Sequence, residues 1–537
     1  MAKSVKREFS LETLESFSGG LNLRADQFNL AKNESPDLLN VMVDPRGGIK
    51  QRDGIDRRNE TPLTTDIKGL WGYHTQNGAN AIIANHGTIL SYSTTGNFTT
   101  FPAGISLRTD GSRCYGITMN DVAYGVSYDK PSFKWDGTNG ADLASPNWAA
   151  DPSDSAVSGM PQAQYIEFWN NFCWVANVYE DSTGKKSRIR WSQANNPEKW
   201  RESDYIDIDI GERGGQITGL APFGDRLVVF KDNGVYIITG FDSDSFQVST
   251  VTTDVGMIAL SSPAIAPNRV YFWDSETGVW SYDRDSIIYH FDSIKPAIED
   301  GTVKFNMAPQ MAFGNNLLFV SLDWTISSVD ERRTLILDPT INSPVGAWVI
   351  TDIDAGAMFT YRPPGSKPQV FAACVANTGS LICLEDENKR VTDRYTGTTE
   401  KHISSYFTTR WVTGRNPIVN KRWGKPRMIT LATATLTLPV EVFKNYDKAQ
   451  SSLDFNVSIT GRTGDSLWGT AKWNNTDPAS GFEAVWTGIP NDLIADIKRL
   501  PTLGTATSVS MKVFGPTTNN TWEINALAFT YVPRRMR

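Results

Sequence analysis

The feature that most constrains the fold of this chain is a hairpin pattern that recurs along it. Each copy has an apolar strand, a turn that contains Gly, Asn or Asp, and a second apolar strand. The clearest copy pairs Arg226–Lys231 with Gly234–Thr239 across the turn Asp232-Asn233. A single hairpin of this kind cannot bury both of its faces, so the copies must stack against one another.

The copies follow one another with a period of about 35 to 50 residues, which is the range of propeller blades. Closure around an axis would also remove exposed sheet edges. We therefore predict an all-β fold with a β-propeller of six or seven irregular blades over residues 61–397. The expected copies are at 67–101, 114–143, 165–193, 188–240, 270–282, 317–338 and 370–384.

Different patterns flank this region. Residues 1–60 are expected to form an extended N-terminal arm, with a turn or short helix at Glu34–Val41 and a hairpin at 47–54. After Tyr395 the hairpin pattern stops, and alternating strands predict a smaller β-sandwich domain over residues 398–537. The best helical candidate is Asn491–Lys498, with its apolar residues on one face.

The composition is that of a soluble globular protein, with 40% hydrophobic and 21% charged residues and a net charge of −7. The acidic balance argues against a general nucleic-acid binder. Four cysteines without CxxC spacing and four scattered histidines predict buried reduced thiols, no metal site and no cofactor. No secretory leader and no membrane span is found, so we expect synthesis in the cytosol.

Candidate catalytic groups are few. Asp207 and Asp209 alternate in YIDIDI and would share one face of a strand, but nothing in the sequence supplies an apolar pocket around them. The segment Asp274–Trp280 partly resembles the aspartate box of sialidase-type propellers, which is a folding element. There is no GxSxG and no phosphate-binding loop. We expect a protein that is not an enzyme.

The segment Lys401–Arg427 carries seven Lys or Arg residues and contains no Asp or Glu. It could contact DNA phosphates, or it could pair with an acidic protein neighbour, and the second interpretation is preferred. Trp411 and Trp423 lie within it, and such tryptophans occur at interface cores and also in aromatic packing against a sheet. The candidate interface residues are Arg410, Trp411, Arg415, Lys421, Arg422, Trp423, Arg534 and Arg535.

Three phrases, spread over the whole chain, resemble a family of bacteriophage tail structural proteins. The first runs from SGGLN to QRDG near the N-terminus, and the second runs from RIRWSQ to YIITG. The third is TRWVTGRNPIVNKRWGKPRMI, which the closing ALAFTYVPRRMR follows.

The resemblance implies a virion tail protein, either a nozzle-type ring or a minor tail protein near the tip. The expected partners are further copies in a homo-oligomeric ring of six-fold symmetry, other tail proteins, DNA in passage during genome ejection, and a host receptor. The chain would be assembled in the host cytoplasm. The alternative is a receptor- or glycan-binding protein at the tail tip, which would use exposed aromatics such as Trp135 and Trp148.

Overall fold

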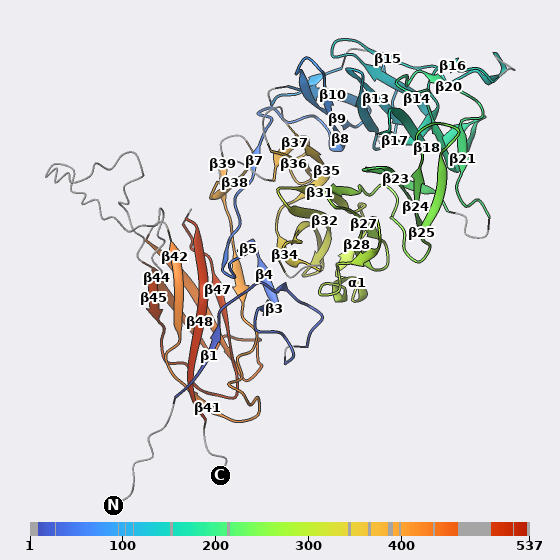
Figure 1. Ribbon diagram of the computed structural model, residues 1–537. Helices are drawn as coiled ribbons and strands as arrows, with labels where there is room; N and C mark the ends of the chain where they lie inside the picture. The colour runs from blue at the N-terminus through green and yellow to red at the C-terminus, as the bar shows by residue number, and fades with distance from the viewer. Residues whose placement is uncertain are drawn as a thin grey trace, which may run out of the picture.

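The computed structural model is built almost entirely of β-strands, which confirms the all-β prediction (Figure 1). The structure describes residues 9–533 except 27, 95, 102–103, 111, 151–153, 212–214, 342–344, 363–366, 385–389, 397–398, 433–434, 460–495 and 519. Within these ranges the only helices are α1 (Pro296–Glu299) and the 3-10 turn η1 (Trp148–Ala150).

Seven sheets built around antiparallel hairpins follow one another along the middle of the chain, and every predicted copy except 188–240 lies within one of them. The first sheet contains β8 (Ile67–His74), β9 (Asn80–His86), β10 (Ile89–Ser93) and β11 (Thr99–Thr100), and the second contains β12 (Tyr115–Met119), β13 (Val122–Ser127), β14 (Lys130–Trp135) and β15 (Gly140–Asp142). The third sheet contains β17 (Gln162–Trp169), β18 (Phe172–Glu180), β19 (Thr183–Trp191) and β21 (Tyr205–Asp207). The fourth contains β22 (Ile217–Phe223), β23 (Arg226–Lys231), β24 (Gly234–Thr239) and β25 (Gln247–Thr252). The strands β16 (Val157–Ser158) and β20 (Lys199–Trp200) pair with each other as a separate two-stranded sheet.

The last three of these sheets follow the same order. The fifth sheet contains β26 (Ala264–Ala266), β27 (Arg269–Asp274), β28 (Gly278–Tyr282) and β29 (Ile287–Tyr289). The sixth contains β31 (Gln310–Gly314), β32 (Leu317–Ile326), β33 (Val329–Asp338) and β34 (Ala347–Thr351), and β30 (Val303–Lys304) pairs with β32. The seventh contains β35 (Ala355–Tyr361), β36 (Gln369–Cys374) and β37 (Ser380–Cys383). We call the first strand of each sheet its inner strand: β8, β12, β17, β22, β26, β31 and β35.

The inner strands lie side by side in chain order. Each contacts the next, from β8 through β12, β17, β22, β26 and β31 to β35. The last of them, β35, also contacts β8. Figure 1 shows the sheets next to one another in the same sequence in the upper part of the molecule.

The stretch 188–240 was expected to be one blade-sized unit, and this prediction is wrong. Arg188–Trp191 is the end of β19 and belongs to the third sheet, where Ile189 lies opposite Ala176 of β18. The hairpin β23–β24 belongs to the fourth sheet. The stretch therefore joins two neighbouring sheets.

The N-terminal segment adds strands to sheets in both halves of the molecule. β2 (Gly20–Leu21) pairs in parallel with β34 and β3 (Glu34–Ser35), and β7 (Asp56–Arg57) pairs with β37. The turn or helix expected at Glu34–Val41 is wrong, because this backbone pairs with strands that lie far away in the sequence. It forms β3, β4 (Asp37–Leu39) and the start of β5 (Val41–Val43), whereas the expected hairpin is present as β5 and β6 (Ile49–Gln51).

Two antiparallel sheets occupy the C-terminal part, which lies below the seven sheets in Figure 1. One sheet contains β41 (Lys421–Trp423), β42 (Arg427–Ala432), β45 (Asp496–Arg499), β46 (Gly504–Ala506) and β48 (Trp522–Pro533), together with β1 (Ser10–Leu14), β5 and β6. The other contains β4, β40 (Tyr406–Thr408), β43 (Leu436–Lys444), β44 (Leu453–Ile459) and β47 (Val509–Phe514). The strands β38 (Thr392–Thr396) and β39 (Thr399–His402) connect this part to β7.

The helix expected at Asn491–Lys498 is wrong in its described part. Asp496–Arg499 forms β45, with Ile497 opposite Ile429 of β42, so pairing along a sheet edge overrides the local helical pattern. Residues 491–495 lie outside the described ranges.

Candidate functional site

A cavity lies where the seven inner strands meet, and we call it the axial cavity. Its volume is about 290 Å³. Each of the seven sheets contributes at least one residue to its wall, namely Leu70, Tyr115, Glu167, Leu220, Ile265, Met311 and Phe359 in chain order. A space of this size accepts a side chain or a small molecule.

Glu167 of β17 is the carboxylate in the wall of this cavity. No ion pair to it occurs within the described ranges, and its Oε1 accepts a hydrogen bond from the N–H of the adjacent Phe168 at 3.0 Å. Burial raises the pKa of Glu167 to about 7, against the opposing effect of that hydrogen bond. A carboxylate in such surroundings is a candidate for a functional role.

Arg113 is the basic residue in the same wall, and its guanidinium already has partners. It lies 4.7 Å from the centre of the Tyr115 ring, and it donates to the side-chain oxygen of Gln310. The Tyr115 ring in turn packs against Tyr165, with ring centroids 4.9 Å apart. The polar side chains of the wall are therefore this arginine, two packed tyrosines, a carboxylate without an ion pair, and the hydroxyl groups of Ser261, Ser262 and Thr360.

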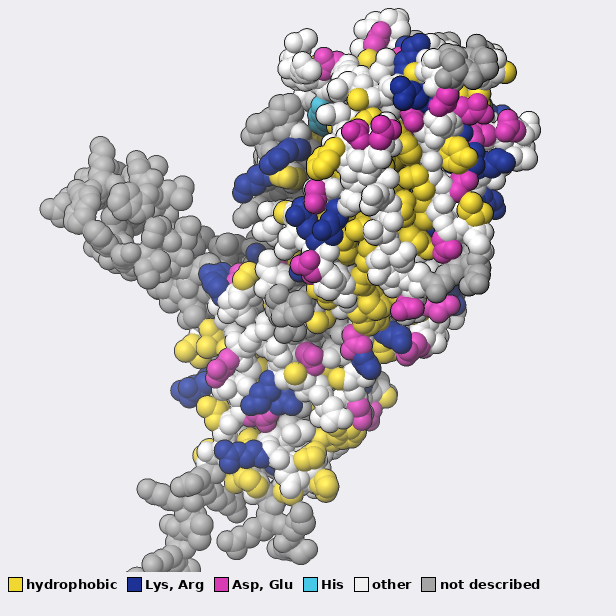
Figure 2. Space-filling view, turned by 45° about the vertical axis from the view of Figure 1, so that its right-hand side comes forward, with side chains coloured by type: hydrophobic (Ala, Val, Ile, Leu, Met, Phe, Trp, Pro, Cys, Tyr) yellow, Lys and Arg dark blue, Asp and Glu magenta, His cyan; other side chains and the backbone are white. Residues whose placement is uncertain are grey.

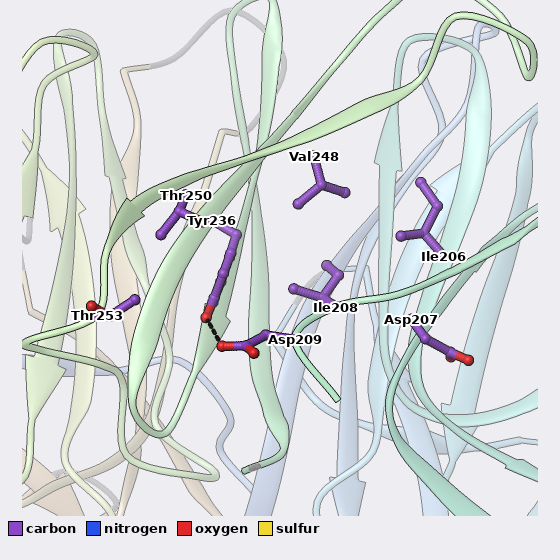
Figure 3. Close-up of a pocket in the computed structure, with 8 residues that line it drawn as sticks. All are labelled: Ile206, Asp207, Ile208, Asp209, Tyr236, Val248, Thr250 and Thr253. Atoms are coloured by element: carbon purple, nitrogen blue, oxygen red, sulfur yellow. Dashed lines mark hydrogen bonds between the residues drawn. The ribbon is translucent and has the colours of Figure 1, made fainter. Parts of the chain in front are cut away.

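A second hollow, an open groove of about 680 Å³, lies between β21 and the fourth sheet (Figure 3). Asp207 and Asp209 both line it. The prediction that the two residues share one face of a strand is wrong, because Asp209 lies beyond the end of β21 and has a φ of 45°. Their carboxylates point in opposite directions. Asp207 accepts two hydrogen bonds from Arg188, at 2.8 and 2.7 Å, and Asp209 accepts one from the Tyr236 hydroxyl at 2.8 Å. They do not form a catalytic pair.

The arginines of the RIRW phrase are engaged in the same region. Arg188 lies over the Tyr205 ring at 3.8 Å, and Arg190 is ion-paired with Glu180. Arg190 also lies over the ring of Trp148 at 4.9 Å, so that ring is partly covered. These residues join β18, β19 and β21 into one sheet, which is a structural role.

Trp135 does not support glycan binding, because only 2% of its surface is exposed. Its ring packs between Phe101, at 4.7 Å, and Tyr92, at 4.7 Å. The expectation that Trp135 is exposed is wrong, since the aromatic residue at the end of β14 fills the core between the first two sheets.

Most of the candidate interface residues in the basic segment are covered by the chain itself. Trp411, Lys421 and Trp423 are buried, so a surface role for these three is wrong. The Lys421 ammonium donates to the carbonyls of Val419 at 2.7 Å and Thr507 at 2.9 Å, and burial lowers its pKa.

Only part of the candidate interface remains accessible. Arg410 is ion-paired with Glu12 of β1 at 2.6 Å, and both side chains are largely covered. Arg415 and Arg422 are exposed, whereas Arg534 and Arg535 lie outside the described residues. On the face shown in Figure 2, acidic and basic side chains are interspersed and a strip of apolar side chains runs between them.

The turn that begins at Asp274 has the geometry expected of a folding element. Its Oδ1 accepts hydrogen bonds from the N–H of Glu276 at 3.1 Å and of Thr277 at 2.9 Å, and from the Thr277 hydroxyl. The Trp280 indole donates to the same hydroxyl at 2.7 Å. The hydrogen bonds that this carboxylate oxygen accepts therefore all come from the turn that it shapes.

The cysteines are free and buried, as predicted. Burial raises the pKa of the Cys114 thiol to about 12 and that of Cys374 to about 11. Within the described part of the chain, no group of three or more His, Cys, Asp or Glu side chains is placed to hold a metal ion. That same part contains no helix long and apolar enough to span a membrane.

Sequence reasoning missed Glu167 and Arg113 as candidate site residues. A signal for Glu167 was present, because it is the one charged residue in the apolar strand QAQYIEFW. Arg113 precedes β12 in a turn-rich segment, and no local pattern marks it.

No model of a known protein family and no curated protein matches this chain. Among solved structures, a YCF48 bound to D1 peptide aligns with 65% of this chain and 99% of its own, at 11% identity and a TM-score of 0.40. BamB from Moraxella catarrhalis aligns with 64% of this chain and 93% of its own, at 11% identity and a TM-score of 0.35. YCF48 from Cyanidioschyzon merolae covers 62% of this chain and 99% of its own, at 12% identity and a TM-score of 0.39. Similarity at these scores carries no argument about function.

Proposed function

We propose that this chain is a non-catalytic structural component of a bacteriophage tail, which assembles into a homo-oligomeric ring in the host cytoplasm and helps to conduct DNA during ejection. The observation that carries the proposal is the structural role of the residues in the three phrases that resemble tail proteins. Their described residues belong to strands, turns and buried packing. A protein whose shared features are architectural is expected to act through its shape and its surfaces.

The proposal includes a fold of seven blades. In it, the seven sheets over residues 61–397 form one propeller, β7 completes the last blade, and residues 398–537 form a β-sandwich. The contact between β35 and β8 and the contribution of all seven inner strands to the axial cavity support closure. The packing of Phe407 of β40 on Trp522 of β48, with ring centroids 6.3 Å apart, supports the sandwich.

DNA would pass through the centre of the ring of copies. The axial cavity of one chain holds about 290 Å³ and is walled by side chains such as Tyr165, Met311 and Phe359, which is the scale of a small ligand. The interspersed charges of Figure 2 suit contacts with neighbouring proteins better than a continuous grip on phosphates.

The exposed arginines of the basic segment, Arg415 and Arg422, are the proposed contacts with an acidic neighbour. Charge reversal of both to Glu should prevent ring formation by the purified protein, as judged by native mass spectrometry and electron microscopy. The wild type should form rings of about six copies. Lys186→Glu, on an exposed hairpin of the third sheet, is the matched control and should leave the rings intact. A monomeric wild type at virion-like concentrations, or virions whose tails lack density for this chain, would contradict the proposal.

The receptor- or glycan-binding alternative is no longer supported by the residues named for it. Trp135 is buried, and Trp148 carries the Arg190 guanidinium over its ring. Adsorption of the isolated protein to host cells would support the receptor-binding alternative.

A further inference from the structure

The axial cavity combines an acidic group, apolar walls and a limited size. Its only carboxylate, Glu167, makes no ion pair with any described residue. Glu167 is half-buried, and a carboxylate that is partly shielded from water without a counter-ion costs free energy, which an incoming cation would recover. The carboxylate without an ion pair therefore indicates that a ligand of this cavity would carry a positive charge.

The other charged group in the wall does not neutralise Glu167. Arg113 is directed to the Gln310 side chain and to the Leu260 carbonyl, and it lies over Tyr115. Burial and the Phe168 N–H are what shift the pKa of Glu167, with no basic side chain among the causes. Glu167 on β17 is thus the one carboxylate of the wall, while the Arg113 Nε and the Tyr115 hydroxyl are buried there without a hydrogen-bond partner among the described residues.

The remaining wall suits an alkyl stem. Leu70, Leu220, Ile265 and Met358 supply aliphatic or thioether surface, and Phe359 supplies an aromatic face. A primary ammonium or guanidinium group on a short hydrocarbon chain has the same division into a charged end and an apolar body. The cavity volume, about 290 Å³, admits such a group but no folded segment.

We propose that the axial cavity binds an alkyl ammonium or guanidinium group, with the Glu167 carboxylate as its counter-ion and the inner strands as its apolar wall. Two sources offer this chemistry, a free diamine and a lysine or arginine side chain of another protein. The proposal does not depend on the role in a phage tail, because it rests on the cavity of a single chain.

The test uses the full-length chain and three probes in isothermal titration calorimetry: 1,5-diaminopentane, N-acetyl-lysine amide and N-acetyl-arginine amide. Wild type should bind at least one of them. Glu167→Gln, which keeps the shape and removes the charge, should bind it more weakly by at least about tenfold. Glu202→Gln, a change at an exposed carboxylate of the same sheet region, should bind like wild type.

A second variant protects the test against misfolding. Glu167→Leu removes the half-buried charge without leaving an unpaired polar group in the wall, so it should fold and should also fail to bind. Binding of the diamine alone would identify a free amine as the ligand, and binding of a capped amino acid would identify a side chain. No binding of any probe by wild type, or equal binding by Glu167→Gln, would overturn the proposal.

Proton release gives an independent readout. A bound cation favours the ionised form of Glu167, so binding near pH 7 should release a proton, and the measured heat should depend on the ionisation enthalpy of the buffer. Glu167→Gln should lose this buffer dependence. Burial raises the pKa of Tyr115 and of Tyr165, so neither of these tyrosines in the wall is expected to lose a proton near pH 7.

Discussion

Arg52 and Asp393 form a doubly hydrogen-bonded ion pair, with Nη1 2.8 Å from Oδ1 and Nη2 2.6 Å from Oδ2, although they lie 341 residues apart in the chain. Each side chain is 2% exposed. Arg52 also contacts Asp352 at 3.0 Å, just beyond β34, and its Nε donates to the side chain of Asn40 at 2.9 Å. The pair thus joins the N-terminal segment to the sixth sheet and to the start of the C-terminal part.

Removal of one partner of this pair should be strongly destabilising. Asp393→Ala leaves the Arg52 guanidinium buried without its main acceptor, and we expect a loss of about 3–5 kcal/mol in the free energy of unfolding. Urea unfolding followed by tryptophan fluorescence would measure it. The matched control is Asp66→Ala, whose partner Lys68 is half-exposed, and its effect should stay below about 1 kcal/mol. Equal effects of the two variants would show that the buried pair contributes no more than a surface pair.

The glycine Gly20 of the SGGLN phrase is required where β2 pairs with β34. Gly20 has a φ of 64°, and a Cβ at this position would lie 2.5 Å from the Trp348 carbonyl oxygen. Gly20→Ala should therefore lift β2 from the sheet, destabilise the fold by about 1–3 kcal/mol and speed tryptic cleavage at the exposed Arg24. Gly78→Ala shares the positive φ, 82°, but has no atom within 4 Å of the added Cβ, so it isolates backbone strain from the clash. If both variants are cleaved at the same rate, the close approach to Trp348 is unimportant.

The four thiols should be inert in the folded protein. All are buried, and burial raises the thiol pKa of Cys114 to about 12 and of Cys374 to about 11, so almost no thiolate is present at neutral pH. Ellman's reagent should titrate none of them in native protein and all four in guanidinium chloride. Thr100→Cys, at an exposed position of β11, should add one rapidly reacting thiol. Rapid reaction of a native thiol in wild type would contradict the described packing.

The local part of this fold was predictable from the sequence, because hairpins are encoded by neighbouring residues. The turn Asp232-Asn233 and the strands around it were placed correctly, and so was the turn that Asp274 shapes. The assignment of strands to sheets was less accessible. The RIRW phrase was grouped with the hairpin after it, although Ile189 pairs with a strand before it.

Long-range relationships could not be deduced, since no local pattern encodes them. Pairing of Asp56 with Cys383 joins residues more than 300 positions apart. Charge was also a poor guide to exposure: Lys421 was expected on a surface, yet backbone carbonyls satisfy its ammonium group in the interior. The axial cavity depends on seven separate strands, so Glu167 acquires its surroundings only in the folded chain.

His290 should make the protein less stable in mild acid. The ring is fully buried, with Nδ1 3.0 Å from the Val345 carbonyl, to which it donates, and Nε2 2.8 Å from the Ser281 hydroxyl. Burial lowers the pKa of His290 to about 4, below its ordinary value of 6.5. Between these two pH values the unfolded chain binds a proton that the folded chain does not, so stability falls as the pH drops from 6.5 towards 4.

The magnitude of this loss follows from the pKa difference and amounts to about 3 kcal/mol between pH 7 and pH 4. His290→Gln lacks the titrating ring, so the stability gap between wild type and variant should narrow by about that amount over the same range. Urea unfolding of both proteins at half-unit pH steps would measure it. Other groups with shifted pKa values, such as Glu167, are present in both proteins and largely cancel in the difference. A gap that stays constant from pH 7 to pH 4 would show that His290 titrates alike in the folded and unfolded chain.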